Sequence, residues 1–357
     1  MTFSENPIVN IIINNYNYGR FLKDAIESSL NQTYSSINVI VVDDGSTDNS
    51  REIIAKYSDE ITAVLKENGG QGSAYNAGFS VAKGEIIIFL DSDDMLLEDI
   101  VQQVVDAFRA DTDVAKVQYR LKLVDVEGTP LGRTSPIAHR KMPKGDLRPK
   151  IFKFPNYIWP PASGNAFSVN AIKQLFPIPE ETYRISADIY VNYLVPFLGS
   201  VISLDQPGAL QRLHGKNNVG STNPNPVDVS SFRKTISFTS GLHDKAIEII
   251  GDKASSMKKR DSKLLIAKMV SLKLDPDNHP LKDNVLAVCI NGIITALTEP
   301  HTKSHQKIFL AIWFIGMTFS SQTSASSLTA ALIHPKNRHP LLMKAILMIR
   351  KMQSKPA

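Results

Sequence analysis

The sequence predicts an α/β fold, in which a mostly parallel sheet is flanked by helices and followed by a helical C-terminal region. Three observations support this prediction. Apolar runs alternate with helix-length segments over roughly the first hundred residues, which is typical of βαβ units. Residues 86–90, IIIFL, are apolar throughout and indicate a strand buried on both faces of a parallel sheet. After residue 230, apolar residues recur at helical spacing.

The predicted elements of this first part alternate without interruption. Strands are expected at residues 9–13, 38–42, 61–65 and 85–90, and helices at residues 20–31, 47–57 and 73–82. Parallel strands that are joined by a helix form right-handed units. These segments therefore predict one sheet with helices on its faces.

The pattern is less regular between residues 101 and 225. It predicts a helix to residue 110, an antiparallel excursion at 115–126, a proline-rich loop at 135–163, and helices at 170–175 and 187–198. Helical spacing then continues in residues 237–250, 262–274 and 283–297. We therefore place a domain boundary near residue 225, between a domain of residues 1–225 and a mostly helical region of residues 226–357.

Three carboxylates, Asp91, Asp93 and Asp94, follow directly after the apolar run. The carboxyl ends of strands are where open α/β sheets bind ligands, and like charges gathered there are costly unless a cation compensates them. Mg²⁺ and Mn²⁺ prefer such oxygen ligands. The alternative is that the acids cap the following helix, a role that suits Asp94 best.

A second acidic segment, DDGSTD at residues 43–48, follows another predicted strand. A carboxylate there can accept the imide N–H of a uracil ring in a site shielded from water. The alternative is a turn in which Asp48 caps a helix. The glycines of NGGQG, residues 68–72, permit a close approach of the backbone to a ligand. The Gly-x-Gly turn of nicotinamide sites is missing after the first strand.

Four segments in order carry a family resemblance. They are VNIIINNYNYGRFLKDAIESSLNQTY, VIVVDDGSTDNS, NGGQGSAYNAGFSVAKGEIIIFLDSDD, and the stretch from SGNAF through SADIYVN to RLHGKNN, and together they cover about residues 8–220. In these segments the chain resembles the family 2 glycosyltransferases of the GT-A fold, which have a Rossmann-like sheet. The resemblance implies a nucleotide-binding half at about residues 1–100 and an acceptor half at about residues 101–225.

The resemblance also implies roles for individual residues. Asp188, in SADIYVN, is the candidate base that removes the proton of an acceptor hydroxyl. Asp44 is expected to contact uracil, and Tyr16 to stack on it. The implied donor-binding set is Asn14, Tyr16, Asp43, Asp44, Gly72, Asn76, Asp91, Ser92 and Asp93; Gly164 and Asn165 belong to the acceptor side, and Asp91, Asp93 and His214 hold Mg²⁺ or Mn²⁺.

These roles have plainer alternatives. Asp188 can be an acid stabilised by the dipole of its helix, His214 a solvated loop histidine, and Tyr16 ordinary packing. Two positions depart from the family pattern: Tyr75 stands where an Arg is common, and Ala187 where the first member of an acidic pair is usual. These departures keep open the alternative of a catalytically silent binding or scaffold protein.

The predicted activity is metal-dependent, inverting transfer of a sugar from a nucleotide-sugar to an acceptor hydroxyl in cell-surface polysaccharide or glycan synthesis. The resemblance implies a UDP-sugar as donor and a glycan or lipid-linked molecule as acceptor. Besides the silent protein, a sugar nucleotidyltransferase is an alternative, although such enzymes usually carry a glycine- and arginine-rich loop after the first strand. That loop is missing here.

The C-terminal charge pattern predicts contact with an anionic membrane. No acid follows Glu299, whereas eight Lys or Arg do, and residues 308–319 carry no charge. Such a segment can lie in a membrane interface, so residues 303–357 are predicted to make a peripheral contact. The alternatives are a core helix and the interface of a homo-oligomer. We expect a cytoplasmic protein that can lie on the inner membrane face, and we do not expect nucleic-acid binding.

Overall fold

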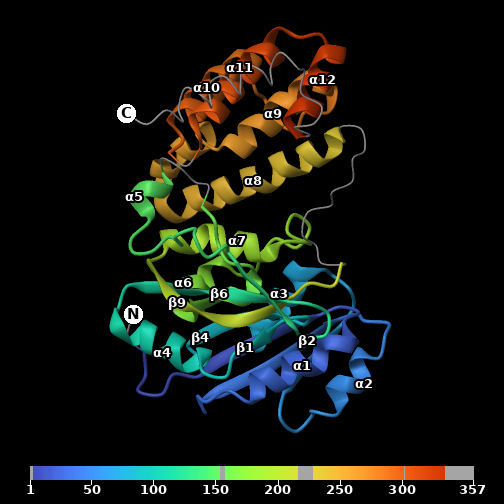
Figure 1. Cartoon of the computed structure of the whole chain (residues 1–357), viewed down its shortest axis with the longest axis vertical. Coiled ribbons are helices and arrows are strands. Elements are labelled where there is room, and N and C mark those ends of the chain that lie inside the picture. The colour runs from blue at the N-terminus through green and yellow to red at the C-terminus, as the bar shows by residue number, and fades with distance from the viewer. Residues whose placement is uncertain (1–2, 153–156, 216–227, 301, 334–357) are drawn as a thin grey trace. The chain divides into compact units, whose positions relative to one another are not determined.

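The structure is a computed structural model that describes residues 3–152, 157–215, 228–300 and 302–333. The chain divides into two compact units. The first comprises Met1–Arg148 and Tyr157–Val219, and the second comprises Pro149–Asn156 and Gly220–Ala357. The first unit contains the sheet, and the described part of the second is helical (Figure 1).

In the described part of the chain, a nine-stranded sheet forms the centre of the first unit. Its strands are β1 (Val9–Asn15), β2 (Ile37–Asp44), β3 (Thr62–Lys66), β4 (Ile86–Asp91), β5 (Met95–Leu96), β6 (Val114–Val124), β7 (Pro130–Ser135), β8 (Asn165–Ser168) and β9 (Ser200–Arg212). Their order is β3-β2-β1-β4-β8-β6-β9-β5, and β7 pairs with β6. Strands β3, β2, β1 and β4 are parallel, whereas β8 is antiparallel to both neighbours. The predicted α/β fold is confirmed.

Helices cover both faces of this sheet (Figure 1). They are α1 (Gly19–Leu30), α2 (Ser50–Ala55), α3 (Gln71–Val81), α4 (Ile100–Ala110), α6 (Val169–Ile172) and α7 (Ala187–Leu194). Ile11 of β1 belongs to one buried core with Leu22 of α1 and Val104 of α4. The next residue, Ile12, faces Gly78 of α3, where an added Cβ would lie 2.5 Å from Ile12 Cγ2. Successive residues of β1 thus contact opposite helical layers.

The long strand β9 is missing from the predicted elements, as is β8. The centre of β9 contains DQPG, residues 205–208, which normally indicates a turn. The pairing of β9 with β6 is irregular at this point, because its register shifts between Gln118 and Arg120. Such irregularities accommodate residues that a regular ladder excludes. The predicted helix 187–198 is also divided, since α7 ends at Leu194 and a 3₁₀ turn, Val195–Phe197, follows.

The second unit confirms the predicted helical C-terminal region. Its described helices are α8 (Val229–Ile250), α9 (Ser262–Leu274), α10 (Val285–Thr298), α11 (Ser304–Phe319) and α12 (Gln322–Ile333), and the short α5 (Arg148–Ile151) begins where the units divide. Helix α9 contacts α8, α10, α11 and α12. At Gly292 of α10, an added Cβ would lie 2.4 Å from the Phe314 ring of α11, so these two helices approach closely.

The predicted membrane segment lies only partly in the described chain. Residues 334–357 are outside it, and the preceding part forms α11 and α12. Trp313, Phe314 and Met317 of α11 are buried in the core of the unit, so one face of this helix is a core face. Among the helices of the described chain, none is both long enough and apolar enough to span a bilayer.

Candidate functional site

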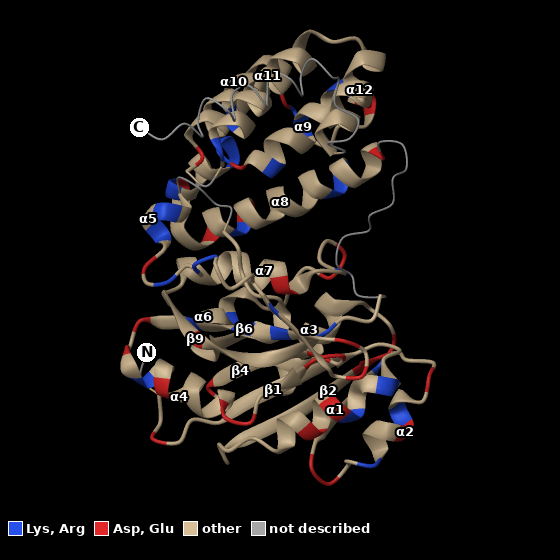
Figure 2. Ribbon diagram, in the orientation of Figure 1, with Lys and Arg blue, Asp and Glu red and all other residues tan. Residues whose placement is uncertain are grey.

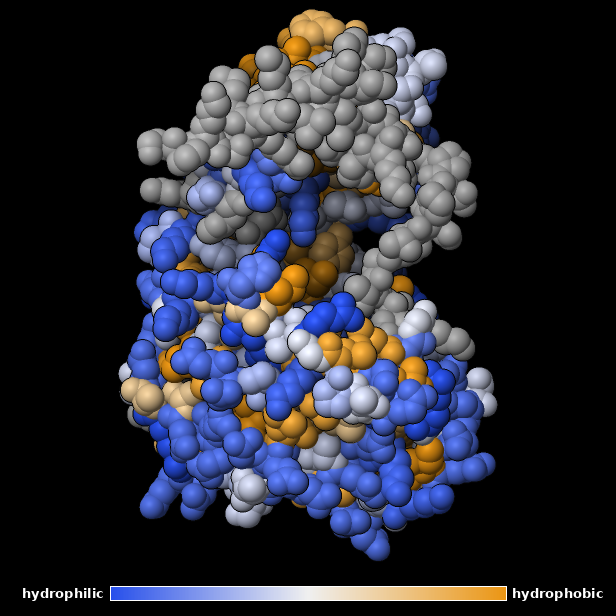
Figure 3. All heavy atoms as spheres, viewed as in Figure 1, coloured by the Kyte–Doolittle hydropathy of each residue, from blue (hydrophilic) through white to orange (hydrophobic). Residues whose placement is uncertain are grey.

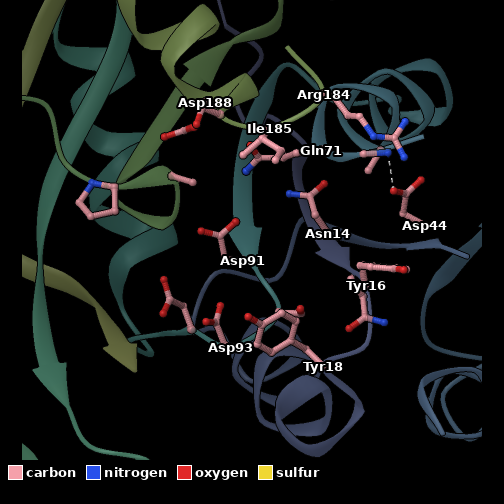
Figure 4. Close-up of a pocket in the computed structure, with 18 of the residues that line it drawn as sticks. Asn14, Tyr16, Tyr18, Asp44, Gln71, Asp91, Asp93, Arg184, Ile185 and Asp188 are labelled. Atoms are coloured by element: carbon pink, nitrogen blue, oxygen red, sulfur yellow. Dashed lines mark hydrogen bonds between the residues drawn. The ribbon is translucent and has the colours of Figure 1, made fainter. Parts of the chain in front are cut away.

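Three parallel strands end at one edge of the sheet, and a cavity opens there. Asn14 of β1 is level with Asp91 of β4, and β2 ends beside β1 at Asp44. The cavity has a volume of about 590 Å³, which is in the usual range for a small-molecule site. Figure 4 shows Asp188 and Asp44 on opposite sides of it, with Asp91 and Asn14 between them.

The structure separates the predicted site residues into two groups. Those that line the cavity are Asn14, Tyr16, Asp44, Asp91, Ser92, Asp93 and Asp188. Those that do not line it are Asp43, Gly72, Asn76, Gly164, Asn165 and His214. The residues of the second group hold in place the segments that form the cavity wall, as their contacts below show.

The carboxylates of Asp91, Asp93 and Asp94 come together at the end of β4, with one oxygen of each within 4.8 Å of the others. Burial, and then repulsion from the neighbouring acids, raises the pKa of Asp91 well above its usual range. The same two effects raise the pKa of Asp94 to about 8. Carboxylates that repel one another at a cavity wall are a donor set that suits a hard divalent cation. The residues present therefore fit Mg²⁺ or Mn²⁺.

Asp94 is held by two distant segments. Its Oδ2 accepts a hydrogen bond from the hydroxyl of Ser163 (2.7 Å), and its Oδ1 accepts one from the N–H of Arg212 (3.1 Å). Ser163 Oγ also accepts the N–H of Asp91 (3.1 Å). The alternative in which Asp94 caps the following helix is wrong, because residues 95–99 separate it from α4, which begins at Ile100.

His214 lies directly against the acidic group. Its Nε2 is 2.8 Å from Oδ2 of Asp93, and its ring packs on Tyr18 and Phe21, with centroid distances of 5.3 and 5.2 Å. Its side chain is 0% exposed, so the alternative of a solvated loop histidine is wrong. Arg212 donates from Nε to the carbonyl of Asp93 (3.3 Å). The end of β9 and the residues after it therefore hold Asp93 in place.

The two aspartates that end β2 differ in their surroundings. Asp43 is fully buried and accepts hydrogen bonds from Asn15 Nδ2 (3.0 Å) and Arg51 Nε (2.9 Å). Asp44 borders the cavity. Its two oxygens accept bonds of 2.7–3.1 Å from Lys66 Nζ, Asn68 Nδ2 and the N–H groups of Gly69 and Gly70. These four donors fill the acceptor sites of one carboxylate and fix the loop at 66–70.

The glycine-rich loop holds the start of the helix that carries Asp188. Gly70 has a φ of 88°, and an added Cβ would lie 2.4 Å from the carbonyl oxygen of Arg184. The N–H of Gln71 donates to that same oxygen (2.7 Å). The side-chain oxygen of Gln71 accepts the N–H of Ala187 (2.9 Å). The close approach that these glycines permit is therefore an approach to residues 184–187.

Gly72 and Asn76, which the resemblance places in the donor-binding set, make contacts away from the cavity. A Cβ on Gly72 would lie 2.7 Å from the carbonyl oxygen of Tyr183. Asn76 Nδ2 donates to the carbonyl of Ile178 (2.9 Å), and Asn76 Oδ1 accepts the N–H of Ile178 (2.7 Å). Both residues thus fasten the segment at 178–183 to α3.

Gly164 and Asn165 lie behind the wall on the predicted acceptor side. A Cβ on Gly164 would lie 2.7 Å from the carbonyl oxygen of Tyr119. Asn165 Nδ2 donates to the carbonyls of Pro161 (2.6 Å) and Ala162 (3.2 Å). Pro161 and Ala162 themselves line the cavity. Gly164 and Asn165 therefore position the residues of the cavity wall without lining the cavity themselves.

Asp188 reaches the cavity from the first turn of α7. The preceding Ser186 has a φ of 66°, a conformation that is uncommon for a residue with a side chain. Burial raises the pKa of Asp188, and the N–H of Ile189 acts in the opposite direction. Stabilisation by the helix N-terminus, the alternative prediction, is thus present as well. A carboxyl group with a raised pKa at a cavity wall is suited to proton transfer.

A sequence model described as Glycosyl transferase family 2 matches residues 10–176, which include the strands that form this cavity edge. The chain belongs to glycosyl transferase family 2. An uncharacterized glycosyltransferase of Nostoc sp. is 39% identical over 217 residues, which is 59% of this chain and 66% of the relative. GlyG of Streptococcus pneumoniae is 38% identical over 119 residues, which is 32% of this chain and 40% of the relative. The chain thus spans less than two thirds of either relative.

The fold of this family 2 protein is shared with a solved structure. TarS of S. aureus, residues 1–349, superimposes with a TM-score of 0.57 and covers 93% of this chain and 92% of its own, at 15% identity. At that identity the likeness shows the fold, and it extends over both the sheet and the helical region. The GT-A architecture that the resemblance implies is confirmed.

Tyr75, at the position where the family commonly has an Arg, is part of the core. It is 1% exposed, and its ring stacks on Phe89 at 3.9 Å. Burial, and then the charges of Asp91 and Asp188, raises its pKa well above the usual range. Within the described residues, neither this hydroxyl nor the buried amide of Asn14 has a hydrogen-bond partner. Of these two residues, Asn14 lines the cavity, so its amide is available to a ligand.

Several residues that line the cavity of this family 2 chain were not predicted from the sequence. They are Tyr18, Gln71, Arg184, Ile185 and Gln211. Tyr18 and Gln71 stand within quoted motifs, so the motif itself was a signal for them. Arg184, Ile185 and Gln211 come from segments with no local signal, and tertiary contacts alone bring them to the wall.

Proposed function

We propose that the protein is a glycosyltransferase that moves a sugar from a UDP-sugar to an acceptor hydroxyl, with inversion at the anomeric carbon. The observation that carries this proposal is one cavity in which the acids at the end of β4 and the carboxylate of Asp188 occupy different walls. Family membership supports the same reaction class. TarS, which shares the fold, has been solved in complex with UDP and with UDP-GlcNAc.

The base of the donor is proposed to lie at the end of the cavity near Asp44. Tyr16 lines the cavity there and is 47% exposed, so its ring offers a face for stacking. Four donors already occupy the acceptor sites of the Asp44 carboxylate. A hydrogen bond from uracil to this carboxylate therefore requires that one of the four donors be displaced. Asn68 Nδ2 is suited to leave, since it also donates to the carbonyl of Asp44 (2.9 Å). The amide of Asn14 has no hydrogen-bond partner among the described residues and faces the middle of the same cavity, so it can bond the ribose or the phosphates.

Asp91 and Asp93 are proposed to hold Mg²⁺ or Mn²⁺, because they are the members of the acidic group that are partly exposed at the cavity. Such a cation would offset the negative charge of the donor's diphosphate. Asp94, Ser163 and Arg212 fix the backbone that carries these ligands. We assign His214 the role of orienting Asp93 through its 2.8 Å contact, as the outer partners of metal ligands do.

Asp188 is proposed to act as the base. As the acceptor oxygen forms its bond to the anomeric carbon, the bond from that carbon to the diphosphate oxygen breaks, and the hydroxyl proton passes to the carboxylate of Asp188. Attack from the face opposite the leaving group gives inversion. The raised pKa of Asp188 makes its carboxylate a better proton acceptor near neutral pH.

Product analysis tests this proposal against both alternatives. The full-length protein is incubated with Mn²⁺ and a set of UDP-sugars, and in parallel with UTP and sugar phosphates. Release of UDP from a UDP-sugar supports the proposal. Consumption of UTP with release of pyrophosphate supports a nucleotidyltransferase. Absence of turnover together with retained UDP-sugar binding supports a silent binding protein.

We also propose that the second unit contacts an anionic membrane surface, where a glycan or lipid-linked acceptor is found. Large apolar side chains with exposed fractions of 39–82% repeat at helical spacing on α10 and α11: Leu286, Ile290, Ile294, Leu297, Ile308, Ile312, Ile315 and Phe319. No acidic residue stands on either helix (Figure 2). Apolar surface is visible at the end of the unit that carries them (Figure 3). Apolar side chains beside lysines are typical of membrane-surface helices.

Vesicle binding by the full chain tests the membrane contact. The double variant Ile290→Glu with Ile312→Glu should co-sediment less with phosphatidylserine vesicles than the wild type, and Leu65→Glu, an exposed position of β3, should not. Equal co-sedimentation of all three proteins would contradict the contact. If the double variant differs from the wild type in its molar mass in solution but co-sediments equally with the vesicles, the exposed apolar face of α10 and α11 is the interface of a homo-oligomer instead.

A further inference from the structure

Arg184 lines the same end of the cavity as Asp44 (Figure 4). It is the one Lys or Arg among the described residues that line this cavity. Its guanidinium donates from Nη1 to the carbonyl oxygen of Gly69 (3.1 Å) and from Nη2 to the side-chain oxygen of Asn68 (2.5 Å). Both of these partners also donate to the carboxylate of Asp44. Arg184 and Asp44 are therefore joined through two shared neighbours.

The side-chain amide of Asn68 lies between a donor and an acceptor. Its Oδ1 accepts the hydrogen bond from Arg184, and its Nδ2 donates to Oδ2 of Asp44 (3.1 Å). A guanidinium can only donate and a carboxylate can only accept, so these two groups fix the direction in which the amide points. Arg184 and Asp44 thus bind an O=C–N–H group, with the guanidinium on its oxygen and the carboxylate on its nitrogen.

Uracil carries the same O=C–N–H group in its ring. A carbonyl oxygen and the imide N–H lie side by side on one edge of the base, so uracil in the place of the Asn68 amide would keep both hydrogen bonds. Asn68 is exposed, and its side chain can therefore turn into solvent when a ligand enters. The two protein groups that the amide satisfies are then free for the base.

The remaining donors to Asp44 limit which base fits. Lys66 Nζ (2.7 Å) and the N–H of Gly69 (2.9 Å) both donate to Oδ1. The N–H of Gly70 (2.7 Å) donates to Oδ2, beside the amide of Asn68. Because each carboxylate oxygen has two lone pairs, departure of the amide frees one position on Oδ2 and none on Oδ1. One N–H can therefore be bound there.

This single position distinguishes uracil from two other bases. Guanine also has an O=C–N–H group, but its adjacent amino group would need a second free acceptor position on the carboxylate. Cytosine presents an amino group where uracil has a carbonyl oxygen, and a ring nitrogen without hydrogen where uracil has the N–H. With cytosine, Arg184 would face a donor and Asp44 an acceptor, and such unpaired polar groups weaken binding.

We propose that Arg184 and Asp44 together recognise the base of the donor, and that the amide of Asn68 occupies the position of uracil until the donor binds. The inference rests on the proposed function, since it assumes a UDP-sugar as donor. It assigns Arg184 as a specificity-determining residue, which donates to a carbonyl oxygen of uracil while Asp44 accepts the N–H. Asn68 is displaced and does not itself bind the base.

Calorimetric titration of the full chain with UDP and with CDP, each with Mn²⁺, tests the role of Arg184. The wild type is compared with Arg184→Met and with the control Arg133→Met, an exposed position of β7. In Arg184→Met, we expect UDP affinity to fall by about 10- to 100-fold, the usual loss when a hydrogen bond to a charged group is removed. The weaker CDP affinity should change little, and Arg133→Met should bind both nucleotides as the wild type does.

The comparison of the two nucleotides separates base recognition from other roles of Arg184. Equal losses for UDP and CDP would overturn the inference, because the ribose and the diphosphate are what the two nucleotides share. Unchanged UDP affinity in Arg184→Met would overturn it as well. In both cases the wild type still binds UDP, so the proposed donor stands. If the wild type binds no UDP, the proposed donor fails and the inference fails with it.

Asn68→Ala tests the displaced amide separately. Removal of the group that uracil must displace should strengthen UDP binding by about 3- to 10-fold, because the free protein no longer satisfies Arg184 and Asp44 internally. The same calorimetric titration measures this gain. Weaker or unchanged UDP binding in Asn68→Ala would contradict the role assigned to Asn68.

Discussion

The imidazole of His214 contacts the carboxylate of Asp93 at 2.8 Å, from Nε2 to Oδ2, although 121 residues separate them in the chain. The ring is buried between this carboxylate and two aromatic side chains. A group held in this way limits the directions in which the carboxylate can turn. The acidic cluster is thus organised by a residue beyond the end of the last strand of the unit.

Replacement of His214 by Phe tests this organising role, because it keeps a ring and removes the nitrogen that contacts Asp93. We expect affinity for Mn²⁺ in the presence of UDP to fall by about 10- to 100-fold, the usual cost of removing an outer partner of a metal ligand. Isothermal calorimetry measures it. His139→Phe, on an exposed loop, is the control. Equal Mn²⁺ affinity in both variants would contradict the assignment.

Asp188→Asn separates chemistry from donor binding. We expect turnover to fall by about 10²- to 10⁴-fold, as the loss of a general base does, with little change in UDP-sugar affinity. Because burial raises the pKa of Asp188, the wild type should lose activity as the pH falls through a value above that of an ordinary carboxyl group. Steady-state kinetics over pH measures both effects. Glu181→Gln, an exposed neighbour, should behave as the wild type; near-normal turnover in Asp188→Asn would place the base elsewhere.

Gly70→Ala and Gly128→Ala form a matched pair, because both glycines have a positive φ, 88° and 89°. At Gly128 nothing lies within 4 Å of an added Cβ, whereas at Gly70 the carbonyl oxygen of Arg184 lies 2.4 Å away. We expect Gly128→Ala to lower the free energy of unfolding by about 1 kcal/mol through backbone strain alone. Gly70→Ala should cost about 1–3 kcal/mol more because of the clash. Urea denaturation measures both losses. Equal losses of unfolding free energy in the two variants would contradict the close contact between Gly70 and Arg184.

Mn²⁺ should stabilise the protein more at about pH 8 than at about pH 5.5. The folded protein holds the pKa of Asp91 and Asp94 above the values of the unfolded chain. Between the unfolded and the folded pKa the folded state binds more protons, so the stability of the metal-free protein falls as the pH rises through this window. A cation that replaces these protons therefore raises the melting temperature more at higher pH. A larger rise at the lower pH, measured by differential scanning fluorimetry, would contradict this account.

The sequence predicted those features that depend on local pattern. The apolar run before Asp91 identified a buried strand, and the charges after it identified the edge where the cavity opens. The alternation of strands and helices up to α4 needed no tertiary information, because length and periodicity distinguish the two.

Features that depend on distant contacts could not be predicted in this way. The glycines at 70 and 72 indicated a close approach, but not that the partners are Arg184 and Tyr183. The contacts of Asp94 could not be predicted, because its hydrogen bond with Ser163 joins segments 69 residues apart. Strand β9 was missed because the turn-forming DQPG stands in its middle, where pairing with β6 overrides local preference.

The central claim is that Asp91 and Asp93 bind a divalent cation together with the donor. Calorimetric titration of UDP-GlcNAc, with and without Mn²⁺, tests it most directly in the wild type, Asp93→Asn and the exposed control Asp99→Asn. We predict that Mn²⁺ strengthens binding at least about tenfold in the wild type and the control, and has no effect in Asp93→Asn. The same gain from Mn²⁺ in all three proteins would contradict the claim.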